Sequence, residues 1–299
     1  MAIGNTEVRY RDWDTLKYWF RGVEKYAPWV RYIFFVSDDQ KPEWLNLDHP
    51  KLKWIKHTDF IPAEYLPTFN SNVISWNLHR IEGLAEKYVY FNDDVFLINT
   101  TEPEDFFKKE MPCCTPALSI VYPYGFYSYT LFNNTMLLNR HFSLRESVRE
   151  NWDKWIKCQS LKELLKMLFF ARKHLIPGIS SNHIHVPRLK ITSEILWQKE
   201  YEVIHATCKN RLRTRDDVSA LCVQGWQILS GMFYPQKPIG KMFSTANLST
   251  DNAVLKYMRK PRGKVICLND NENEMKFELH KQMIIQEFER IFPEKSSIE

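Results

Sequence analysis

Two adjacent carboxylates and an amide interrupt an otherwise apolar segment of this chain. Asn92, Asp93 and Asp94 lie between the apolar runs 88–91 and 95–98. Because such residues are depleted in strands and carboxylates are rarely buried unpaired, we expect the triplet at a strand end. Asn92 and Asp94 share one side of an extended chain, so both can reach one ion. These oxygen ligands suit Mg²⁺ or Mn²⁺ bridging to phosphates, but an Asx-type turn explains the triplet equally well.

Two other apolar runs, 34–36 and 265–268, also lead into clusters of acids and amides. The clusters are Ser37-Asp38-Asp39 and Asn269-Asp270-Asn271. Ends of parallel strands line the ligand crevice of open α/β sheets, so such clusters can converge on one site. The first cluster runs on into Gln40, Lys41 and Pro42, which is typical of a turn and a solvated loop. We therefore expect the second cluster, through Asn269 and Asp270, to join Asp93 and Asp94 as metal ligands.

A protonatable side chain follows in the segment 182–187. His185 precedes Pro187, which favours an extended backbone at Val186. An imidazole with a pKa near its ordinary value of about 6.5 can accept a proton from a hydroxyl at neutral pH, so His185 is a candidate general base. His183 shares a strand face with it by parity, which leaves a metal-binding pair open. An exposed loop histidine without a role is the simplest alternative.

Four cations alternate along the chain just before Asp216 and Asp217. They are Lys209, Arg211, Arg213 and Arg215. The planar guanidinium of arginine donates two parallel hydrogen bonds, which suits a diphosphate. A solvated basic face explains the same pattern. Arg9 and Arg11, ahead of the first expected helix, allow the same two interpretations.

Helical and strand patterns alternate and must position these residues. Apolar residues at 16, 19, 20 and 23 predict a helix, followed by strands at 32–36 and 52–55 and a helix at 71–86. This alternation predicts an α/β fold with a mainly parallel, Rossmann-like sheet flanked by helices. A helix at 217–232, a strand at 265–268 and a helix at 274–292 follow. We expect one catalytic domain over 1–299, with a helical insertion at 141–178.

Composition places the chain among ordinary globular proteins. It has 299 residues, of which 44% are hydrophobic and 26% charged, with a net charge of +5. The scattered Lys and Arg residues give weak support for anionic ligands and argue against nucleic acid as a partner. No apolar run approaches the ~20 residues that span a bilayer, and the six cysteines form no CxxC motif. We expect a cytoplasmic protein whose basic segment 145–173 either contacts the inner membrane peripherally or is a solvated helix face.

Many sequence blocks, in order, resemble the Stealth proteins. This family includes bacterial capsule polysaccharide phosphotransferases and the α/β subunit of the lysosomal-enzyme N-acetylglucosamine-1-phosphotransferase. The similar blocks cover nearly the whole chain: 9–14, 25–29, 44–46, 66–69, 78–81 and 90–94, then 185–187 and 213–217, then 267–271 and 292–299.

The resemblance implies an enzyme that transfers a sugar 1-phosphate from a nucleotide diphosphate sugar to a glycan hydroxyl and releases a nucleoside monophosphate. The acceptor glycan is free or lipid-linked. His185, Arg213 and Asp217 are then expected to be catalytic, with Asp217 orienting either His185 or Arg213. Mg²⁺ or Mn²⁺ is the implied cofactor. The implied substrate-binding residues are Arg9, Arg11, Asp12, His79, Arg80 and Asn92.

The chain departs from the family pattern at two places. No Trp-Val-Asp-Gly-like first motif precedes Arg9, which predicts an N-terminally shortened chain. Ser75 stands where relatives commonly carry Glu, which predicts altered substrate or metal geometry. Two alternatives follow: a metal-dependent glycosyltransferase that forms a glycosidic bond, and a non-catalytic remnant that binds a nucleotide sugar or glycan.

Overall fold

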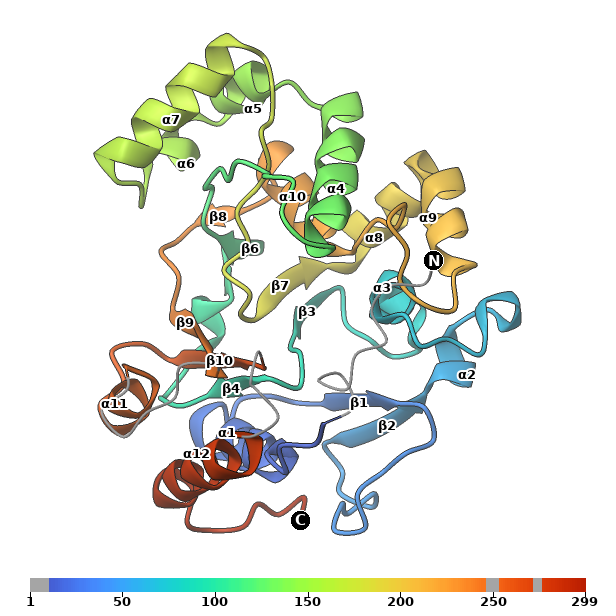
Figure 1. Cartoon of the computed structure of the whole chain (residues 1–299), viewed down its shortest axis with the longest axis vertical. Coiled ribbons are helices and arrows are strands. Elements are labelled where there is room, and N and C mark those ends of the chain that lie inside the picture. The colour runs from blue at the N-terminus through green and yellow to red at the C-terminus, as the bar shows by residue number, and fades with distance from the viewer. Residues whose placement is uncertain (1–10, 246–252, 271–275) are drawn as a thin grey trace.

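The fold is of the α/β class, as the alternating sequence patterns predict. A computed structural model describes residues 11–245, 253–270 and 276–299. Figure 1 shows a lower part, built from β1, β2, β4, β10, α1 and α12, and an upper part that is mainly helical. No helix within the described residues is both long enough and apolar enough to cross a bilayer.

The described strands form four small sheets. Their bounds are β1 Ile33–Ser37, β2 Leu52–Lys56, β3 Lys87–Tyr90, β4 Val95–Leu97, β5 Phe107–Lys108, β6 Met111–Cys114, β7 Val186–Leu189, β8 Tyr234–Pro235, β9 Gly240–Ser244 and β10 Val265–Asn269. The pairs β1–β2, β9–β10 and β6–β8 are parallel, whereas β4–β10, β3–β7 and β5–β6 are antiparallel. Among the described residues the sheets are therefore mixed. Strand direction depends on long-range pairing that local alternation does not encode.

Helices cover these sheets and fill the upper part. Their bounds are α1 Leu16–Tyr26, α2 His57–Phe60, α3 Ser71–Asn77, α4 Tyr127–His141, α5 Leu144–Glu150, α6 Trp152–Ile156, α7 Leu161–Arg172, α8 Lys190–Lys199, α9 Tyr201–Cys208, α10 Leu221–Leu229, α11 Ala253–Arg259 and α12 Phe277–Ile291. The expected helix at 71–86 ends early, in a 3₁₀ turn at Leu78–Arg80, and Gly83 follows with a φ of 75°. The segment 141–178, expected to be a helical insertion, contains α5, α6 and α7.

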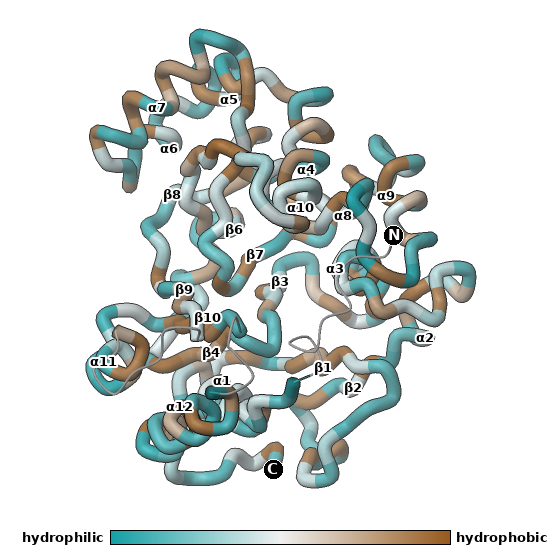
Figure 2. The backbone as a smooth tube through the Cα atoms, viewed as in Figure 1, coloured by the Kyte–Doolittle hydropathy of each residue, from teal (hydrophilic) through white to brown (hydrophobic). Residues whose placement is uncertain are grey.

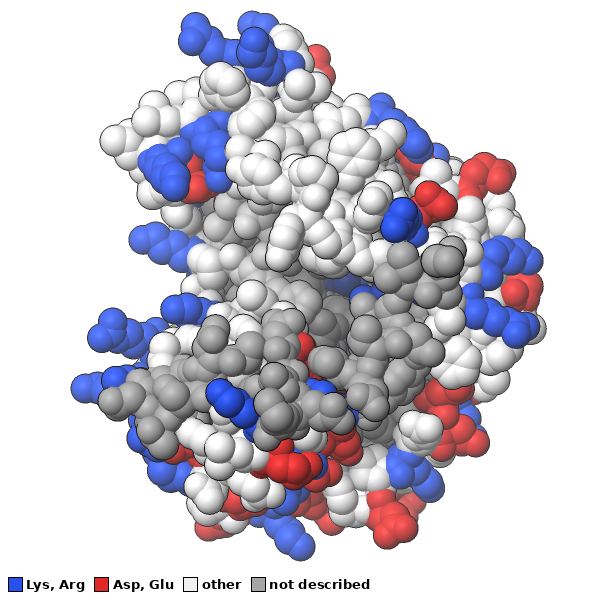
Figure 3. Space-filling model, viewed as in Figure 1, with Lys and Arg blue, Asp and Glu red and all other residues white. Residues whose placement is uncertain are grey.

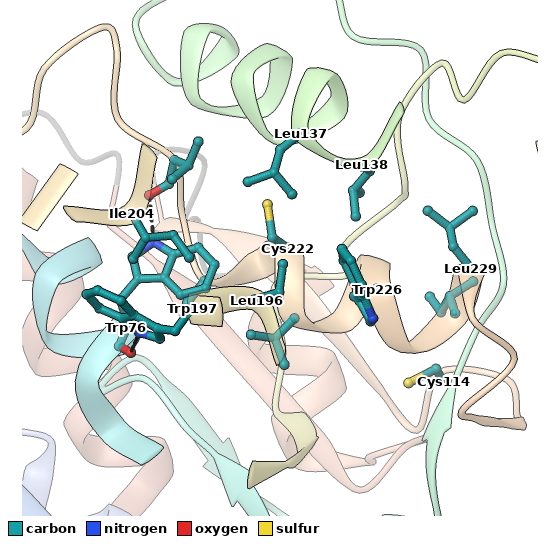
Figure 4. Packing of buried hydrophobic residues seen from close by; sticks show 14 of the residues in the cluster. Trp76, Cys114, Leu137, Leu138, Leu196, Trp197, Ile204, Cys222, Trp226 and Leu229 are labelled. Atoms are coloured by element: carbon teal, nitrogen blue, oxygen red, sulfur yellow. Dashed lines mark hydrogen bonds between the residues drawn. The ribbon is translucent and has the colours of Figure 1, made fainter. Parts of the chain in front are cut away.

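The upper part has its own hydrophobic core. Trp76 of α3 and Trp197 of α8 pack together there, and the indole of Trp197 donates a hydrogen bond of 2.8 Å to the carbonyl of Trp76. Leu137 and Leu138 of α4 and Trp226 of α10 extend the same cluster (Figure 4). This packing holds α3, α4, α8 and α10 together in the upper part.

In the lower part, α1 packs directly on β4. Gly22 permits this contact, since a Cβ atom there would lie 2.8 Å from the carbonyl oxygen of Leu97. On the same helix, buried Arg21 donates to both carboxylate oxygens of Glu299, at 2.6 and 2.8 Å, and contacts Glu289 at 3.5 Å. We call these three residues the C-terminal clamp. They fasten the end of the chain to the helix that supports β4.

Candidate active site

The antiparallel pair β3–β7 brings the two histidines beside the acidic segment. Its last pair is Tyr90 with Val186, so the residues after Tyr90 run alongside those before Val186. The ring of His185 accordingly stacks on Phe91, with centroids 5.9 Å apart. Two residues earlier in the chain, His183 Nε2 lies 3.8 Å from Asp94 Oδ2. This register places an imidazole next to the carboxylate.

Strand β10 brings the second acidic cluster to the same place. The amide of Leu268 donates a hydrogen bond of 2.8 Å to the carbonyl of Asp94, and Cys267 Sγ donates to Asp94 Oδ2 over 3.4 Å. Asn269 ends the strand, and the next residue, Asp270, accepts a 3.0 Å hydrogen bond from the indole of Trp13. Two of the three predicted clusters therefore meet at one end of β4 and β10.

The remaining cluster, Ser37-Asp38-Asp39, begins at the end of β1 and continues into the loop after it, as its sequence predicts. Asp38 lies 3.5 Å from His57, and Asp39 pairs with Lys56 at 2.7 Å. Asp39 is thus paired with a cation on β2, and Asp38 faces an imidazole on α2 whose pKa burial lowers. They provide a contrast to the pair at 93–94.

Asp93 and Asp94, which we call the acid pair, repel each other, and the imidazole of His183 lies 3.8 Å from one oxygen of Asp94. The pKa of Asp93 is raised first by the loss of solvation among the surrounding protein atoms and then by the negative charge of Asp94. The charge of Asp12 raises it further. Asp94 Oδ1 is buried and has no hydrogen-bond partner. A buried unpaired carboxylate oxygen costs free energy unless a ligand satisfies it. The donor set therefore fits a divalent cation.

Two ligand sets share Asp94. One atom each of Asp94, His183 and Cys267 lie within 4.8 Å of one another, an arrangement able to hold a metal. Burial, and then the charge of Asp94, raise the pKa of the Cys267 thiol, whose Sγ donates to Asp94 Oδ2. The second set is the predicted one: Asp93 and Asp94 lie just before β4, and Asn269 and Asp270 lie at the end of the paired strand β10 and just after it.

A loop from the upper part carries Arg213. One of its guanidinium nitrogens, Nη2, donates to Ser71 Oγ at the start of α3. Fully buried Asp217 holds this loop, because its carboxylate accepts hydrogen bonds from Thr214 N at 3.0 Å, Thr214 Oγ1 at 2.7 Å and Asn70 Nδ2 at 2.8 Å. Among the described residues no hydrogen bond or ion pair joins Asp217 to His185. The contacts thus link Asp217 to the Arg213 loop.

The positive charge of Arg213 also affects the pKa of His183, which lies beside the acid pair. The Asp94 carboxylate raises the pKa of His183, whereas burial and the positive charge of Arg213 oppose this rise. The same charge opposes the increase that burial causes in the pKa of Tyr127, at the start of α4. Arg213, His183 and Asp94 therefore share one environment. Figure 3 shows that this face of the molecule is hollowed across its middle, with atoms of both charge signs visible in the hollow.

His185 is more deeply buried than its loop position predicts. Its ring stacks on Phe91 and meets the edge of Phe106 at 4.9 Å, and its Nδ1 atom has no hydrogen-bond partner. Burial lowers the pKa of His185 to about 3, so its imidazole is neutral at pH 7. It also lines a recess between β6 and β7, together with Gln224 and Gln236.

The remaining predicted residues lie in varied surroundings. His79 is buried, and its Nδ1 is 3.0 Å from the carbonyl of Trp76; burial and then the charge of Arg80 lower its pKa to about 4. Arg80 stacks over Trp197 at 5.0 Å. The side chains of His79 and Arg80 thus contact Trp76 and Trp197 in the upper hydrophobic core.

The N-terminal candidates lie beside α12 or outside the described residues. Arg11 stacks over Phe277 at 5.1 Å, and exposed Asp12 contributes to the charge around Asp93. Asn92 is partly buried, and its carbonyl accepts from Val95 N at 3.2 Å. Arg9 and Asn271 lie outside the described residues.

The sequence suggested for His183 only that it shares a strand face with His185, as an alternative metal-binding pair. That parity requires an extended backbone, but His183 has a φ of 46°. The left-handed conformation turns His183 toward Asp94 while His185 enters the core. The Asn182-His183 dipeptide was the available signal, since Asn and His adopt this conformation more readily than most residues.

Comparisons with known proteins agree with the motif resemblance. The chain matches the family model described as Stealth protein CR2, conserved region 2, over residues 9–114, which includes the acid pair. It is 37% identical over 297 residues to the capsular polysaccharide phosphotransferase WcwK of Streptococcus pneumoniae, covering 99% of this chain and 88% of that protein. It is 36% identical over 299 residues to the receptor polysaccharide phosphotransferase WefC of Streptococcus gordonii, covering 99% and 89%. A shorter match, 44% over 158 residues, links 53% of the chain to 66% of the capsular polysaccharide phosphotransferase CpsJ of Streptococcus thermophilus.

Proposed function

This chain belongs to the Stealth family, and from this premise we propose that it is a sugar-1-phosphate transferase of surface polysaccharide synthesis. The donor is a nucleotide diphosphate sugar, the acceptor is a glycan hydroxyl, and the leaving group is a nucleoside monophosphate. The names of its relatives support phosphotransfer in making capsular or receptor polysaccharide. The observation that carries the proposal for this chain is the convergence of β3, β7 and β10 on an acid pair with a buried, unpartnered oxygen.

The acid pair is proposed to hold Mg²⁺ or Mn²⁺, helped by Asn269 and Asp270. When bound, such an ion neutralises the negative charge of a diphosphate and of the transition state. Hard carboxylate and amide oxygens suit these two ions, whereas the set that includes Cys267 suits a softer metal.

The protein's own residues are proposed to orient the phosphates and take up the proton. Arg213 donates hydrogen bonds to phosphate oxygens, and Asp217 fixes the loop that carries it. Arg9, Arg11 and Asp12 are proposed to approach the donor from the N-terminal side. His79, Arg80 and Asn92 are retained as substrate-binding proposals that rest on the motif resemblance alone.

In the reaction the acceptor oxygen attacks the sugar-bearing phosphorus in line. A new phosphorus–oxygen bond forms, the bond to the bridging oxygen breaks, and the nucleoside monophosphate leaves with that oxygen. The hydroxyl proton passes to an imidazole. His185 is the candidate from the sequence, and its Nδ1 has no partner, but burial lowers its pKa to about 3 and so weakens it as a proton acceptor. His183 is the second, because it lies 3.8 Å from the Asp94 carboxylate.

Parallel substitutions separate the two histidines. If His185 is the base, His185→Ala should lower turnover about 10²–10⁴-fold while His183→Ala has a smaller effect. The opposite order would assign the base to His183. His183→Gln serves as a control for side-chain volume and hydrogen bonding.

Product analysis tests the proposed reaction. With a nucleotide diphosphate sugar and an acceptor glycan, we expect a phosphodiester product and a nucleoside monophosphate. A glycosidic bond and a nucleoside diphosphate would instead show an ordinary glycosyltransferase. Cation-dependent binding of the donor without either product would support a binding remnant.

The acceptor is proposed to be a glycan chain, free or carried on a lipid. All six cysteines are free thiols, which suits the reducing cytoplasm where we propose the enzyme works, at the inner face of the membrane. Comparing turnover of a lipid-linked acceptor with that of the free glycan would separate the two acceptor forms.

A further inference from the structure

The outward face of α7 is apolar. Leu161, Leu165, Leu168 and Phe169 are 73%, 60%, 44% and 58% exposed. Their spacing of four, seven and eight residues from Leu161 places them in one stripe along the helix. Figure 2 shows α7 at the outer tip of the molecule, with hydrophobic stretches along it. A surface helix normally turns such a stripe toward the core.

The core of this chain already has its own contacts with α7. Met167 and Ala171 are buried in the upper hydrophobic cluster, and Leu164 packs against it. Met167 and Ala171 lie on the side of the helix away from Leu165, and Leu164 lies between that side and the exposed stripe. The exposed stripe is therefore a second apolar face, without a partner among the described residues.

Neighbouring elements extend this surface. Trp152 and Ile156 are exposed on α6, one helical turn apart, and Leu175 is exposed just after α7. Helices α6 and α7 each pack against α5, and all three helices lie at the tip in Figure 1. We call the seven exposed side chains the tip patch: Trp152, Ile156, Leu161, Leu165, Leu168, Phe169 and Leu175.

The tip patch has a basic rim. The segment 144–175 holds eight Lys and Arg residues against four Asp and Glu residues, which accounts for most of the chain's net charge of +5. Lys162 and Lys173 are exposed along one edge of the stripe, and Arg172 is exposed at its end. The acidic residue of α7, Glu163, pairs with Lys166 at 2.6 Å. The charge that remains around the patch is positive.

We propose that the tip patch is a docking surface for an anionic lipid bilayer. Leucine, phenylalanine and tryptophan side chains enter the boundary between headgroups and acyl chains, while lysine and arginine side chains contact negative headgroups. A second copy of this chain is a poorer occupant, because two copies joined through this face would bring like-charged rims together. The proposal does not depend on the phosphotransfer reaction, and it assigns to α6 and α7 a role outside the active site.

Vesicle binding by the full chain tests this surface directly. We expect the wild type to co-sediment with vesicles of phosphatidylcholine and phosphatidylglycerol, and to bind pure phosphatidylcholine vesicles much more weakly. The double variant Leu165→Glu/Phe169→Glu should bind at least about tenfold more weakly. Removing two rim charges, in Lys162→Gln/Lys173→Gln, should cause a similar loss on anionic vesicles only, since each basic residue near the surface contributes about fivefold.

A matched control is Leu279→Glu, which replaces an equally exposed leucine (63%) on α12, outside the tip patch. It should bind vesicles like the wild type. Because all substituted side chains are exposed, each variant should unfold at the wild-type temperature, which is checked in parallel. Equal vesicle binding by Leu165→Glu/Phe169→Glu and wild type would overturn the proposal. A wild-type dimer that this double variant dissociates, with no vesicle binding, would overturn it in favour of a second copy.

Discussion

The C-terminal clamp satisfies its buried charges within the protein, whereas the acid pair leaves one buried carboxylate oxygen without a hydrogen-bond partner. Arg21 meets both oxygens of Glu299 and also contacts Glu289. At the acid pair, Asp94 raises the pKa of Asp93, and Asp94 Oδ1 is buried without a partner. Internal pairing stabilises a fold, whereas unpaired like charges reduce stability and leave capacity for a ligand. Substitutions should therefore affect stability in the clamp and activity at the acid pair.

The largest effect is expected at Asp94. Asp94→Asn should lower the release of nucleoside monophosphate by at least about 10³-fold, since it removes a ligand for an ion worth several kcal/mol in the transition state. Its unfolding temperature should be unchanged or higher, because a like charge is removed. Enzyme assays and thermal unfolding measure the two effects. Asp39→Asn, in the loop after β1, is the control and should leave turnover unchanged. Turnover of Asp94→Asn within tenfold of wild type would contradict the role of Asp94.

The clamp should show the opposite behaviour. Arg21→Met leaves buried Glu299 without its cation, and should lower the free energy of unfolding by about 3–5 kcal/mol. Urea unfolding measures this loss, and turnover per folded molecule should stay close to wild type. Arg149→Met breaks an exposed pair with Glu150 and should cost only about 0–1 kcal/mol. If both substitutions cost the same, the clamp is not a buried ion pair in solution.

Arg213 should resemble the acid pair rather than the clamp. Arg213→Ala should lower turnover about 10²–10³-fold, because a charge directed at the phosphates is lost. Arg215→Ala, two residues on, removes an exposed cation that stacks over Tyr129 at 5.0 Å, and is the matched control. Steady-state kinetics on both variants provide the measurement. Equal losses would indicate that the whole basic segment, and not Arg213, contacts the donor.

The sequence predicted the features that are encoded locally. An apolar run next to acids placed the acid pair at a strand end, and the same pattern located Asn269 at the end of β10. It could not show that β3 pairs with β7, which begins almost a hundred residues later and sets the position of the histidines. The role of His183 was missed because one left-handed residue breaks strand parity. The structural role of Asp217 depends on Asn70, a contact across 147 residues.

The smallest effect is the acid sensitivity of the clamp. Burial alone would raise the pKa of Glu299, but the hydrogen bonds and charge of Arg21 outweigh it and lower the pKa below its ordinary value of 4.5. The stabilisation is thus fully present above that value and is lost as the pH falls through the folded-state pKa. The difference in unfolding temperature between wild type and Glu299→Gln should therefore shrink on acidification. A difference that stays constant with pH would exclude this linkage.

Binding of Mn²⁺, followed by electron paramagnetic resonance, tests most directly whether the acid pair binds a cation. With a nucleotide diphosphate sugar present, wild type and Glu299→Gln should each bind Mn²⁺, and Asp94→Asn should lose this binding while remaining folded. Equal Mn²⁺ binding by Asp94→Asn and wild type, or no binding by wild type, would contradict the metal-site assignment.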